Sequence, residues 1–405
     1  MNLLSNARVV RVERSTEDVS WLMGRLEALF TGATTSVLVP AGGEEMPPAV
    51  VTDVEKRAVR DLDDVRLVVR TSGSTTGHGR LVGLSADQLR ASIEATDERI
   101  GGPGTWVLAL PPHHIAGLQV VARSVLAGTT PQVLAGSFSP DNLADGVEEA
   151  LSRDRTVHVS LVPTQLLDAL ASRRATDSLA RCTSVLVGGA AADPALVERA
   201  RQASIPVLLT YGMSETCGGC VYDGSPLTGA RVALGPGPGS GDSSGRVWLG
   251  GPMVMSGYLD GELGVTVADS TRWLATSDLG HLESGRLVID GRIDDVIITG
   301  GLKVNASEVA AAVRTTGMVE HATVVGLPDP RWGQVVTAIV VPSTAWDGPE
   351  ALREAVAERL PRTHAPRLVV TVADIPMLES GKVDRISAGA AARRARDEGR
   401  AWHRD

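Results

Sequence analysis

The sequence predicts an α/β protein. We expect a large N-terminal domain with mostly parallel sheets flanked by helices plus a β-rich portion, and a small α+β C-terminal domain. Three observations lead to this prediction. From residue 65 to residue 209, short apolar runs alternate with helical patterns, which is typical of a parallel sheet with helices on both faces. After residue 216 the chain changes to short β-type runs and tight turns, and a polar stretch at residues 291–295 precedes a compact α+β pattern.

The individual elements of the first half follow from hydrophobic periodicity. An amphipathic helix is predicted at residues 17–30, because its apolar residues recur on one face. Short strand candidates follow at residues 37–39 and 50–51. The alternating region then predicts strands at 65–69, 106–110, 133–135, 157–162, 185–187 and 207–209, and helices at 115–126, 142–151, 165–172 and 194–202.

The second half of the chain predicts two further groups of elements. The β-rich portion has strands at 232–234 and 247–249 and a hairpin at 280–289 that turns at Glu283-Ser-Gly285. Beyond the polar stretch, the pattern predicts helices at 307–314 and 350–360 and strands at 322–325, 337–341 and 368–372. We therefore expect two domains, residues 1–293 and residues 294–405.

Composition restricts the class of protein. An apolar content of 43% and a charged content of 21% are those of an ordinary globular protein. The net charge of -9 argues against a nucleic-acid-binding protein, which normally carries a basic face. No apolar run reaches the length of a membrane span, and the N-terminus lacks the apolar core of a secretory signal. Three cysteines are too few for a disulfide framework, so we expect a protein of the reducing cytoplasm.

A loop rich in hydroxyl groups and glycine follows the predicted strand at 65–69. It reads Arg70-Thr-Ser-Gly-Ser-Thr-Thr-Gly-His-Gly-Arg80 and precedes the helix start Ser85-Ala-Asp-Gln88, which has a capping-box pattern. In a strand–loop–helix unit, backbone N–H groups and hydroxyls donate to phosphate oxygens, and Arg80 adds a positive charge. The loop is not a Walker A motif, because Gly77 is followed by His-Gly. A flexible Ser/Gly loop is the alternative that the residues alone leave open.

Other polar motifs follow the carboxyl ends of the predicted strands. They are Pro111-Pro-His-His114, Pro163-Thr-Gln165, Gly188-Gly-Ala190 and Tyr211-Gly-Met-Ser-Glu-Thr216. Open α/β sheets bind ligands at this edge, so the motifs predict one ligand site. Each residue also has an ordinary structural interpretation: Glu215 as an acid in a first helical turn, Tyr211 as a core residue and His114 as a structural histidine.

Lysine is rare in this chain. Among 39 basic residues, only Lys56, Lys303 and Lys382 are lysines. Lys382 lies in the polar, glycine-containing loop Glu379-Ser-Gly-Lys-Val-Asp384. A lysine in such a loop of an arginine-rich protein indicates a chemical role for a compact charge.

Taken together, these motifs resemble those of the adenylate-forming acyl-CoA ligases. Ser277-Asp-Leu-Gly280, Gly291-Arg-Ile-Asp-Asp295 and Gly300-Gly301 complete the set, in the family's order, over residues 65 to about 390. The segments 110–117 and 211–222 resemble most closely the branch of the family that activates o-succinylbenzoate for menaquinone biosynthesis. The resemblance implies the adenylate-forming fold with a mobile C-terminal domain. It also implies a reaction in which a carboxylate attacks the α-phosphorus of ATP, and CoA then attacks the acyl-adenylate.

The resemblance assigns an ATP and Mg²⁺ site. Glu215 would bind Mg²⁺, Ser214 would contact the α-phosphate, Tyr211 would lie against adenine, and Asp278, supported by Arg292, would accept the ribose hydroxyls. The remaining residues of the implied ATP site are Thr71, Ser72, Gly73, Ser74, Thr75, Thr76, Gly77, Arg80, Gly188, Gly189, Ala190, Gly212, Met213 and Thr216.

The resemblance also assigns the acid, the catalytic lysine and CoA. Lys382 would bridge the carboxylate and the α-phosphate, and Asp294 would be the hinge of the C-terminal domain. Gly300 and Gly301 would approach the pantetheine of CoA after that domain rotates. His114, Thr164, Gln165 and Gly189 are expected near an aromatic carboxylic acid.

The sequence departs from the family pattern at two places. The phosphate loop has an extra Thr76 and ends Gly77-His-Gly-Arg80 where the family usually has Gly-x-Pro-Lys. Only some 64 residues precede the first strand of the alternating region, so we expect less of the acid pocket to come from upstream sequence.

Several alternatives stay open. They are a ligase for another aryl or acyl acid, an adenylation enzyme that loads a carrier protein, and a non-catalytic nucleotide-binding homologue. Whether the protein forms a homodimer also stays open. A serine hydrolase is excluded, because Gly73-Ser-Thr-Thr-Gly77 lacks the central serine of a nucleophile elbow.

Overall fold

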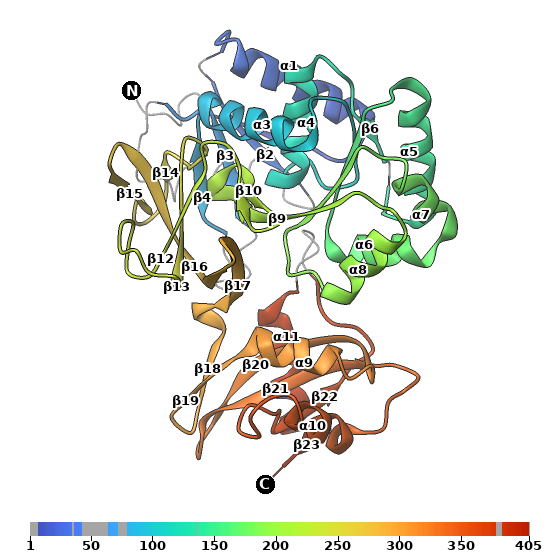
Figure 1. The fold of residues 1–405 in the computed structure, drawn as a ribbon, viewed down its shortest axis with the longest axis vertical. Coiled ribbons are helices and arrows are strands. Elements are labelled where there is room, and N and C mark those ends of the chain that lie inside the picture. Colours follow the sequence, from blue (N-terminus) through green and yellow to red (C-terminus); the bar gives the residue numbers. More distant parts are fainter. Residues whose placement is uncertain are drawn as a thin grey trace.

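The structure is a computed structural model that describes residues 7–34, 36–42, 64–71, 79–134, 136–377 and 383–404. It has a large N-terminal domain and a small C-terminal domain below it (Figure 1). The predicted α/β class is confirmed: the large domain has a mostly parallel sheet flanked by helices and a β-rich portion, and the small domain is α+β. Among the described residues, no helix has the length and apolar character needed to cross a membrane.

The sheet at the centre of the large domain has the strand order β11-β10-β9-β8-β7-β5-β6. Its strands β5 to β9 pair in parallel, and β10 and β11 add antiparallel strands. The strands are β5 (Thr105–Leu108), β6 (Gln132–Val133), β7 (Val157–Leu161), β8 (Ser184–Gly188), β9 (Val207–Met213), β10 (Gly218–Tyr222) and β11 (Ser225–Pro226).

Helices cover both faces of this sheet, as the alternating pattern predicted. Successive residues of a strand point to opposite faces. Accordingly, Trp106 and Leu108 belong to one core with α1, α3 and α4, whereas Val107 packs in a second core with α5 to α8. The helices are α1 (Thr16–Phe30), α3 (Ala86–Ile100), α4 (Ile115–Ala127), α5 (Pro140–Arg153), α6 (Pro163–Ala171), α7 (Arg173–Leu179) and α8 (Pro194–Gln202).

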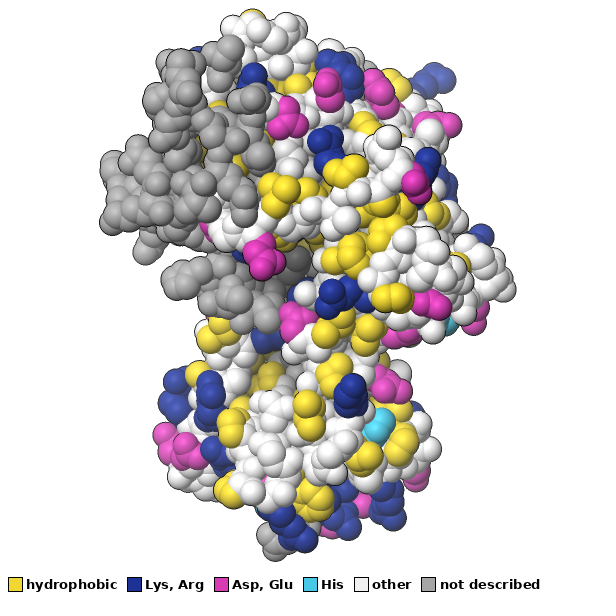
Figure 2. Space-filling view, turned by 90° about the vertical axis from the view of Figure 1, so that its left-hand side faces the viewer, with side chains coloured by type: hydrophobic (Ala, Val, Ile, Leu, Met, Phe, Trp, Pro, Cys, Tyr) yellow, Lys and Arg dark blue, Asp and Glu magenta, His cyan; other side chains and the backbone are white. Residues whose placement is uncertain are grey.

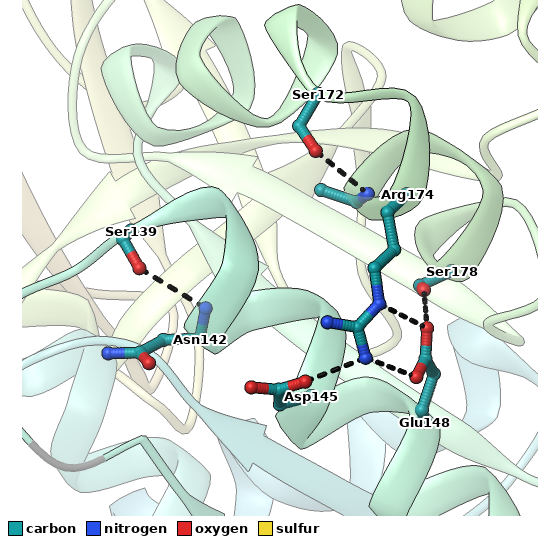
Figure 3. A network of polar contacts seen from close by, with 8 residues as sticks. Ser139, Asn142, Asp145, Glu148, Ser172, Arg174 and Ser178 are labelled. Atoms are coloured by element: carbon teal, nitrogen blue, oxygen red, sulfur yellow. Dashed lines mark hydrogen bonds and ion pairs between the residues drawn. The ribbon is translucent and has the colours of Figure 1, made fainter.

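The short helix α7 was not predicted from the sequence, and a polar network accounts for it. The guanidinium of Arg174 is paired with Asp145 at 2.6 Å and with Glu148 at 2.6 Å, both on α5 (Figure 3). Ser178 also donates to Glu148 at 3.0 Å, and Ser172 caps the helix. A surface cavity of about 440 Å³ adjoins this network. The arginines that line this cavity face carboxylates on α5 and α7, so the polar network joins these two helices.

A second sheet of the large domain has the order β1-β2-β3-β4-β14. Here one prediction is wrong: the hydroxyl-rich loop does not lead directly into a helix. It joins β3 to β4, which pair antiparallel with Arg70 opposite Leu81, and α3 follows β4 with the predicted capping box of Ser85 and Gln88. β3 therefore does not share a sheet with β5 to β9. The strands are β1 (Ala7–Arg11), β2 (Val37–Ala41), β3 (Leu67–Arg70), β4 (Leu81–Leu84) and β14 (Gly257–Tyr258). The strand candidate at 50–51 lies outside the described residues.

The β-rich portion forms a third, antiparallel sheet. The predicted hairpin is confirmed, and Ser284 and Gly285 at its turn have φ of +51° and +78°, as a type I′ turn requires. In this hairpin Asp278 lies directly opposite Arg292. The strands are β12 (Arg231–Leu234), β13 (Ser244–Gly250), β15 (Val265–Ala268), β16 (Thr271–Glu283) and β17 (Arg286–Arg292).

The small domain is a mixed sheet with helices on both faces and a core of its own. The short 3₁₀ helix η3 (Ile293–Asp295) connects it to β17. Helices α9 and α10 pack on one face of the sheet and α11 packs on the other. Its elements are β18 (Val296–Thr299), β19 (Leu302–Asn305), α9 (Ala306–Arg314), β20 (Val319–Asp329), β21 (Gly333–Pro342), α10 (Pro349–Ala357), β22 (Leu368–Thr371), α11 (Arg385–Asp397) and β23 (Trp402–His403).

Candidate active site

Two carboxylates expected in the ATP site lie at the end of β9. Tyr211 is on β9 itself, which extends to Met213, so this motif is not a loop beyond the strand. Glu215 follows in the 3₁₀ helix η2 (Ser214–Thr216). The hydroxyl of Tyr211 donates to Oδ2 of Asp278 on β16 at 2.6 Å. The fold thus joins the central sheet to the third sheet at the predicted site.

Asp278 is held from several directions. Its carboxylate is buried, and its Oδ1 lies 3.8 Å from Nη1 of Arg292 on the neighbouring strand. Its backbone N–H donates to Thr276 at 3.0 Å. Burial, together with the negative charge of Asp278, raises the pKa of Tyr211 well above its ordinary value. Tyr211 therefore stays protonated as the donor, and Asp278 stays the acceptor.

Glu215 has a neutral hydrogen-bond donor that sequence analysis did not identify. The hydroxyl of Tyr258 on β14 donates to Oε1 of Glu215 at 2.6 Å, and the N–H of Met255 donates to the carbonyl of Glu215 at 2.8 Å. Burial and the charge of Glu215 raise the pKa of Tyr258, which keeps it protonated. A signal was present in the sequence: the chain has only three tyrosines, and a rare residue indicates a specific role as lysine does here.

The turn after Glu215 is fixed by helices α3 and α4. Cys217 has φ of +53°, and its carbonyl accepts from Gln119 at 2.6 Å and from Ser92 at 3.1 Å. Thr216 donates to the carbonyl of Gly218 at 2.7 Å. Sequence analysis did not identify Ser92 and Gln119, because their partner is a backbone carbonyl that carries no sequence signal.

The cysteines show no metal-binding arrangement. Cys182, Cys217 and Cys220 are buried free thiols, and burial raises the pKa of Cys220 to about 12. Within the described ranges, no group of three or more His, Cys, Asp or Glu side chains is arranged to hold a metal ion.

The glycine motif at the end of β8 packs directly against β9. A Cβ on Gly188 would lie 2.2 Å from Oγ1 of Thr210, the residue before Tyr211. Gly189 has φ of +82°, a conformation that favours glycine. Ala190 follows it. These residues therefore provide a close backbone surface beside Tyr211.

The described ends of the hydroxyl-rich loop are joined to each other. The N–H of Arg80 donates to Oγ1 of Thr71 at 2.7 Å, and the N–H of Thr71 donates to the carbonyl of Arg80 at 3.0 Å. The guanidinium of Arg80 lies 3.5 Å from the centre of the Tyr258 ring. The other expected loop residues, Ser72, Gly73, Ser74, Thr75, Thr76 and Gly77, lie outside the described residues.

The residues expected near the acid lie at the ends of neighbouring strands β5 and β7. His114 is the N-cap of α4, and Thr164 and Gln165 are in the first turn of α6. Nε2 of Gln165 donates to the carbonyl of Ala109 at 3.2 Å. Upstream sequence reaches this region, because Arg14 also donates to the carbonyl of Ala109.

The residues expected to form the hinge lie next to Asp278, because Arg292 contacts both Asp278 and Asp294. Arg292 donates to Asp294 at 2.7 Å, and Asp295 is ion-paired with Arg385 at the start of α11. Burial alone would lower the pKa of Arg292, but Asp294 and Asp278 raise it. Figure 2 shows this region as a waist between the two domains, where acidic and basic side chains lie together.

The remaining C-terminal residues are placed as follows. Gly300 and Gly301, with φ of +57° and +81°, form the turn between β18 and β19, a hairpin that extends away from the large domain (Figure 1). Lys382 lies outside the described residues. On either side of its loop, Met377 and Val383 form an antiparallel bridge.

Comparisons with known proteins agree with this arrangement. Residues 11–259 match the model of the AMP-binding enzyme family, and residues 308–382 match that of the AMP-binding enzyme C-terminal domain. A probable 2-succinylbenzoate–CoA ligase of Mycobacterium tuberculosis H37Rv is 41% identical over 373 residues, which cover 87% of this chain and 94% of the relative. The 2-succinylbenzoate–CoA ligase of Bacillus velezensis is 30% identical over 367 residues, covering 86% and 74%.

Among solved structures, the o-succinylbenzoate CoA synthetase of Bacillus subtilis has the same fold. Its complex with ATP and magnesium superposes with a TM-score of 0.75 at 23% identity, covering 95% of this chain and 89% of that one. Its complex with the acyl-adenylate gives a TM-score of 0.72 at 24% identity, covering 94% and 87%. From the family models and the 41% identical relative, the chain belongs to the AMP-binding enzyme family.

Proposed function

We propose that this protein is an AMP-forming acid–CoA ligase that activates o-succinylbenzoate through an acyl-adenylate in menaquinone biosynthesis. The observation that carries the proposal is the paired arrangement at the end of β9. There Tyr211 holds Asp278 and Tyr258 holds Glu215, in a chain 41% identical to a probable 2-succinylbenzoate–CoA ligase. Each carboxylate accepts a hydrogen bond from a tyrosine hydroxyl, which orients it. Asp278 would meet the ribose hydroxyls and Glu215 a divalent cation.

The residues at this end of β9 fit the binding of ATP with Mg²⁺. Magnesium binds one or two carboxylates together with phosphate oxygens, and Glu215 is a buried carboxylate beside the Thr71–Arg80 loop. When bound, the ion would reduce the negative charge of the phosphates. Asp278 would accept the ribose hydroxyls, Arg292 would orient Asp278, and Ser214 would contact the α-phosphate. Tyr211 and the Gly188–Ala190 segment would enclose the adenine.

Activation joins a carboxylate to a polyanion, so positive charge and positioning supply most of the catalysis. We assign the bridging charge to Lys382. Arg385, three residues later, is ion-paired with Asp295 in the short segment that follows Arg292. The start of α11, to which the loop of Lys382 leads, therefore contacts the segment that follows the expected ribose site. His114, Thr164, Gln165 and Gly189 would contact the acid.

The second half-reaction needs the CoA thiol at the acyl-adenylate. We propose that residues 294–405 rotate about Asp294 relative to residues 1–293, withdrawing Lys382 and bringing Gly300 and Gly301 toward the pantetheine. The rotation would break the contact between Asp295 and Arg385 or move it with the domain. We further propose a cytoplasmic enzyme, which suits three free thiols, and a homodimer.

The test is ATP–pyrophosphate exchange with o-succinylbenzoate, with benzoate and octanoate as control acids, for wild type and Lys382→Ala. We expect exchange with o-succinylbenzoate alone, and its loss in the variant. Exchange with another acid would keep the mechanism and replace the substrate. Absence of exchange with every acid would contradict the proposal and favour a non-catalytic homologue.

A second measurement separates a CoA ligase from an enzyme that loads a carrier protein. AMP release with o-succinylbenzoate is followed with and without CoA. We expect multiple turnovers only with CoA. AMP release that CoA does not stimulate would contradict the ligase proposal.

A further inference from the structure

We propose that Tyr258 is a positioning residue that holds Glu215 for the metal and Arg80 for the phosphates. This inference rests on the proposed function, because it takes Glu215 as the metal-binding carboxylate. Tyr258 contacts Glu215 and Arg80 at once: its hydroxyl donates a hydrogen bond to Glu215, and the guanidinium of Arg80 stacks on its ring.

The hydroxyl fixes the orientation of the Glu215 carboxylate. The O–H to O distance of 2.6 Å is that of a hydrogen bond to a charged acceptor. The Glu215 residue is 9% exposed, so few water molecules compete for this bond. The backbone of Glu215 is also bonded to Met255, three residues before Tyr258. One short segment thus holds both the backbone and the side chain of Glu215.

The ring of Tyr258 holds Arg80 through the register of the sheet. Tyr258 lies opposite Val82, and the N–H of Leu259 donates to the carbonyl of Leu81. Arg80 is two residues from Val82 and so lies on the same face, diagonal to Tyr258. Its guanidinium stacks on the ring with the carbon 3.5 Å from the ring centre. The planar guanidinium can stack face to face on the ring while its N–H groups remain free to donate at the ring edge.

The turn after Tyr258 completes the support of Arg80. Its Nη2 donates to the carbonyls of Asp260 and Glu262, and its Nε lies 3.5 Å from Oδ1 of Asp260. The cation therefore lies on the face of a ring whose hydroxyl bonds the anion. One side chain therefore fixes the positions of both groups, the carboxylate through its hydroxyl and the guanidinium through its ring.

The test separates the hydroxyl from the ring. Tyr258→Phe keeps the ring under Arg80 and removes the hydroxyl bonded to Glu215. ATP affinity is measured by isothermal titration calorimetry in EDTA and in excess Mg²⁺, and the ratio of the two affinities gives the gain due to the metal. Glu215→Gln is the reference. Tyr222→Phe is the matched control, because its hydroxyl is also buried but contacts Thr96.

We expect Tyr258→Phe to reduce the metal-dependent gain by about tenfold, with ATP affinity in EDTA unchanged, because a hydrogen bond to a charged group is lost. Tyr222→Phe should keep the wild-type ratio. Tyr258→Leu removes the ring as well, so it should also weaken ATP binding in EDTA. Thermal unfolding of each variant confirms that the protein compared is folded.

Other outcomes overturn the inference at different levels. If Glu215→Gln keeps the wild-type gain, the metal assignment in the proposed function is wrong, and the role of Tyr258 fails with it. If Glu215→Gln loses the gain but Tyr258→Phe keeps it, the inference alone is wrong. An equal loss in EDTA and in Mg²⁺ for Tyr258→Phe would also contradict it, because a positioning role toward the metal must depend on the metal.

Discussion

Neutral donors hold the two site carboxylates. Tyr211 donates to Asp278, and Tyr258 donates to Glu215, each at 2.6 Å. Asp278 also has a cation beside it, since Arg292 lies 3.8 Å away, whereas Tyr258 is a neutral donor to Glu215. Burial raises the pKa of both tyrosines, so each stays protonated and remains a hydrogen-bond donor. Two of the three tyrosines in the chain therefore donate a hydrogen bond to a carboxylate of the candidate site.

A buried histidine elsewhere in the large domain should make the free energy of unfolding depend on pH. His158 on β7 is fully buried, its Nδ1 lies 2.8 Å from the hydroxyl of Ser184, and its ring packs 5.0 Å from that of Trp106. Burial lowers the pKa of His158 to about 4. The unfolded chain, with a histidine pKa of about 6.5, therefore binds more protons than the folded protein between pH about 6.5 and about 4.

The free energy of unfolding should accordingly fall as the pH falls through this window, by on the order of 3 kcal/mol. Urea unfolding of wild type and His158→Asn at pH about 7 and about 4.5 checks this, and the variant should show a smaller decrease. His403→Asn, at an exposed position, is the control. An equal decrease in wild type and His158→Asn would exclude His158 as the cause.

At the level of elements, the β9–β10 hairpin carries the site. The two strands approach so closely that a Cβ on Gly212 would lie 2.1 Å from the carbonyl of Gly218. The intervening turn contains Glu215 and is held by Ser92 on α3 and Gln119 on α4. The position of Glu215 therefore depends on two helices and two strands packing together.

Gly212→Ala should destabilise the protein by about 1–3 kcal/mol and weaken ATP binding, because backbone atoms have to move. Gly24→Ala is the matched control: Gly24 is exposed within α1, and a Cβ there meets no atom within 4 Å. It should raise stability by roughly 0.5–1 kcal/mol. Thermal unfolding and ATP titration of both variants provide the measurement. Equal melting temperatures for the two would contradict the close approach of the strands.

For the whole molecule, charged residues at positions 292–295 connect Asp278, the carboxylate proposed to bind ribose, to the small domain. Arg292 lies between Asp278 and Asp294, and Asp295, whose side chain is 7% exposed, pairs with Arg385. A cavity of about 210 Å³ lies beside these residues in the small domain. Asp295 and Arg385 both lie in residues 294–405, so this pair fixes the start of α11 against the segment that follows Asp294.

Arg385→Ala should slow ATP–pyrophosphate exchange by about tenfold, because the start of α11, which follows the loop of the proposed catalytic Lys382, loses its contact with Asp295. Acylation of CoA from added acyl-adenylate should change less, because that step does not use Lys382. Arg393→Ala, at an exposed position of the same helix, is the control. An equal loss in both half-reactions would contradict a role specific to the first orientation.

The amino-acid sequence alone predicted most helices and strands, since hydrophobic periodicity reports which face of an element is buried. It failed at a very short strand: Leu81–Leu84, four residues between the polar loop and the cap of α3, was not recognised as β4, so the loop before it was expected to lead into a helix. It also missed α7, whose Arg174 network with α5 is tertiary.

The sequence alone also identified three residues of the candidate site, because Tyr211, Glu215 and Asp278 lie in recognisable motifs. Their contacts came from the tertiary structure. Tyr258 reaches Glu215 across 43 positions of sequence, and Asp278 faces Arg292 because of the register of a hairpin. Arg80 stacks on Tyr258 because β4 and β14 are neighbours in a sheet. Hydrogen bonds and stacking act over a few ångströms, so they depend on how distant segments pack, which local periodicity does not encode.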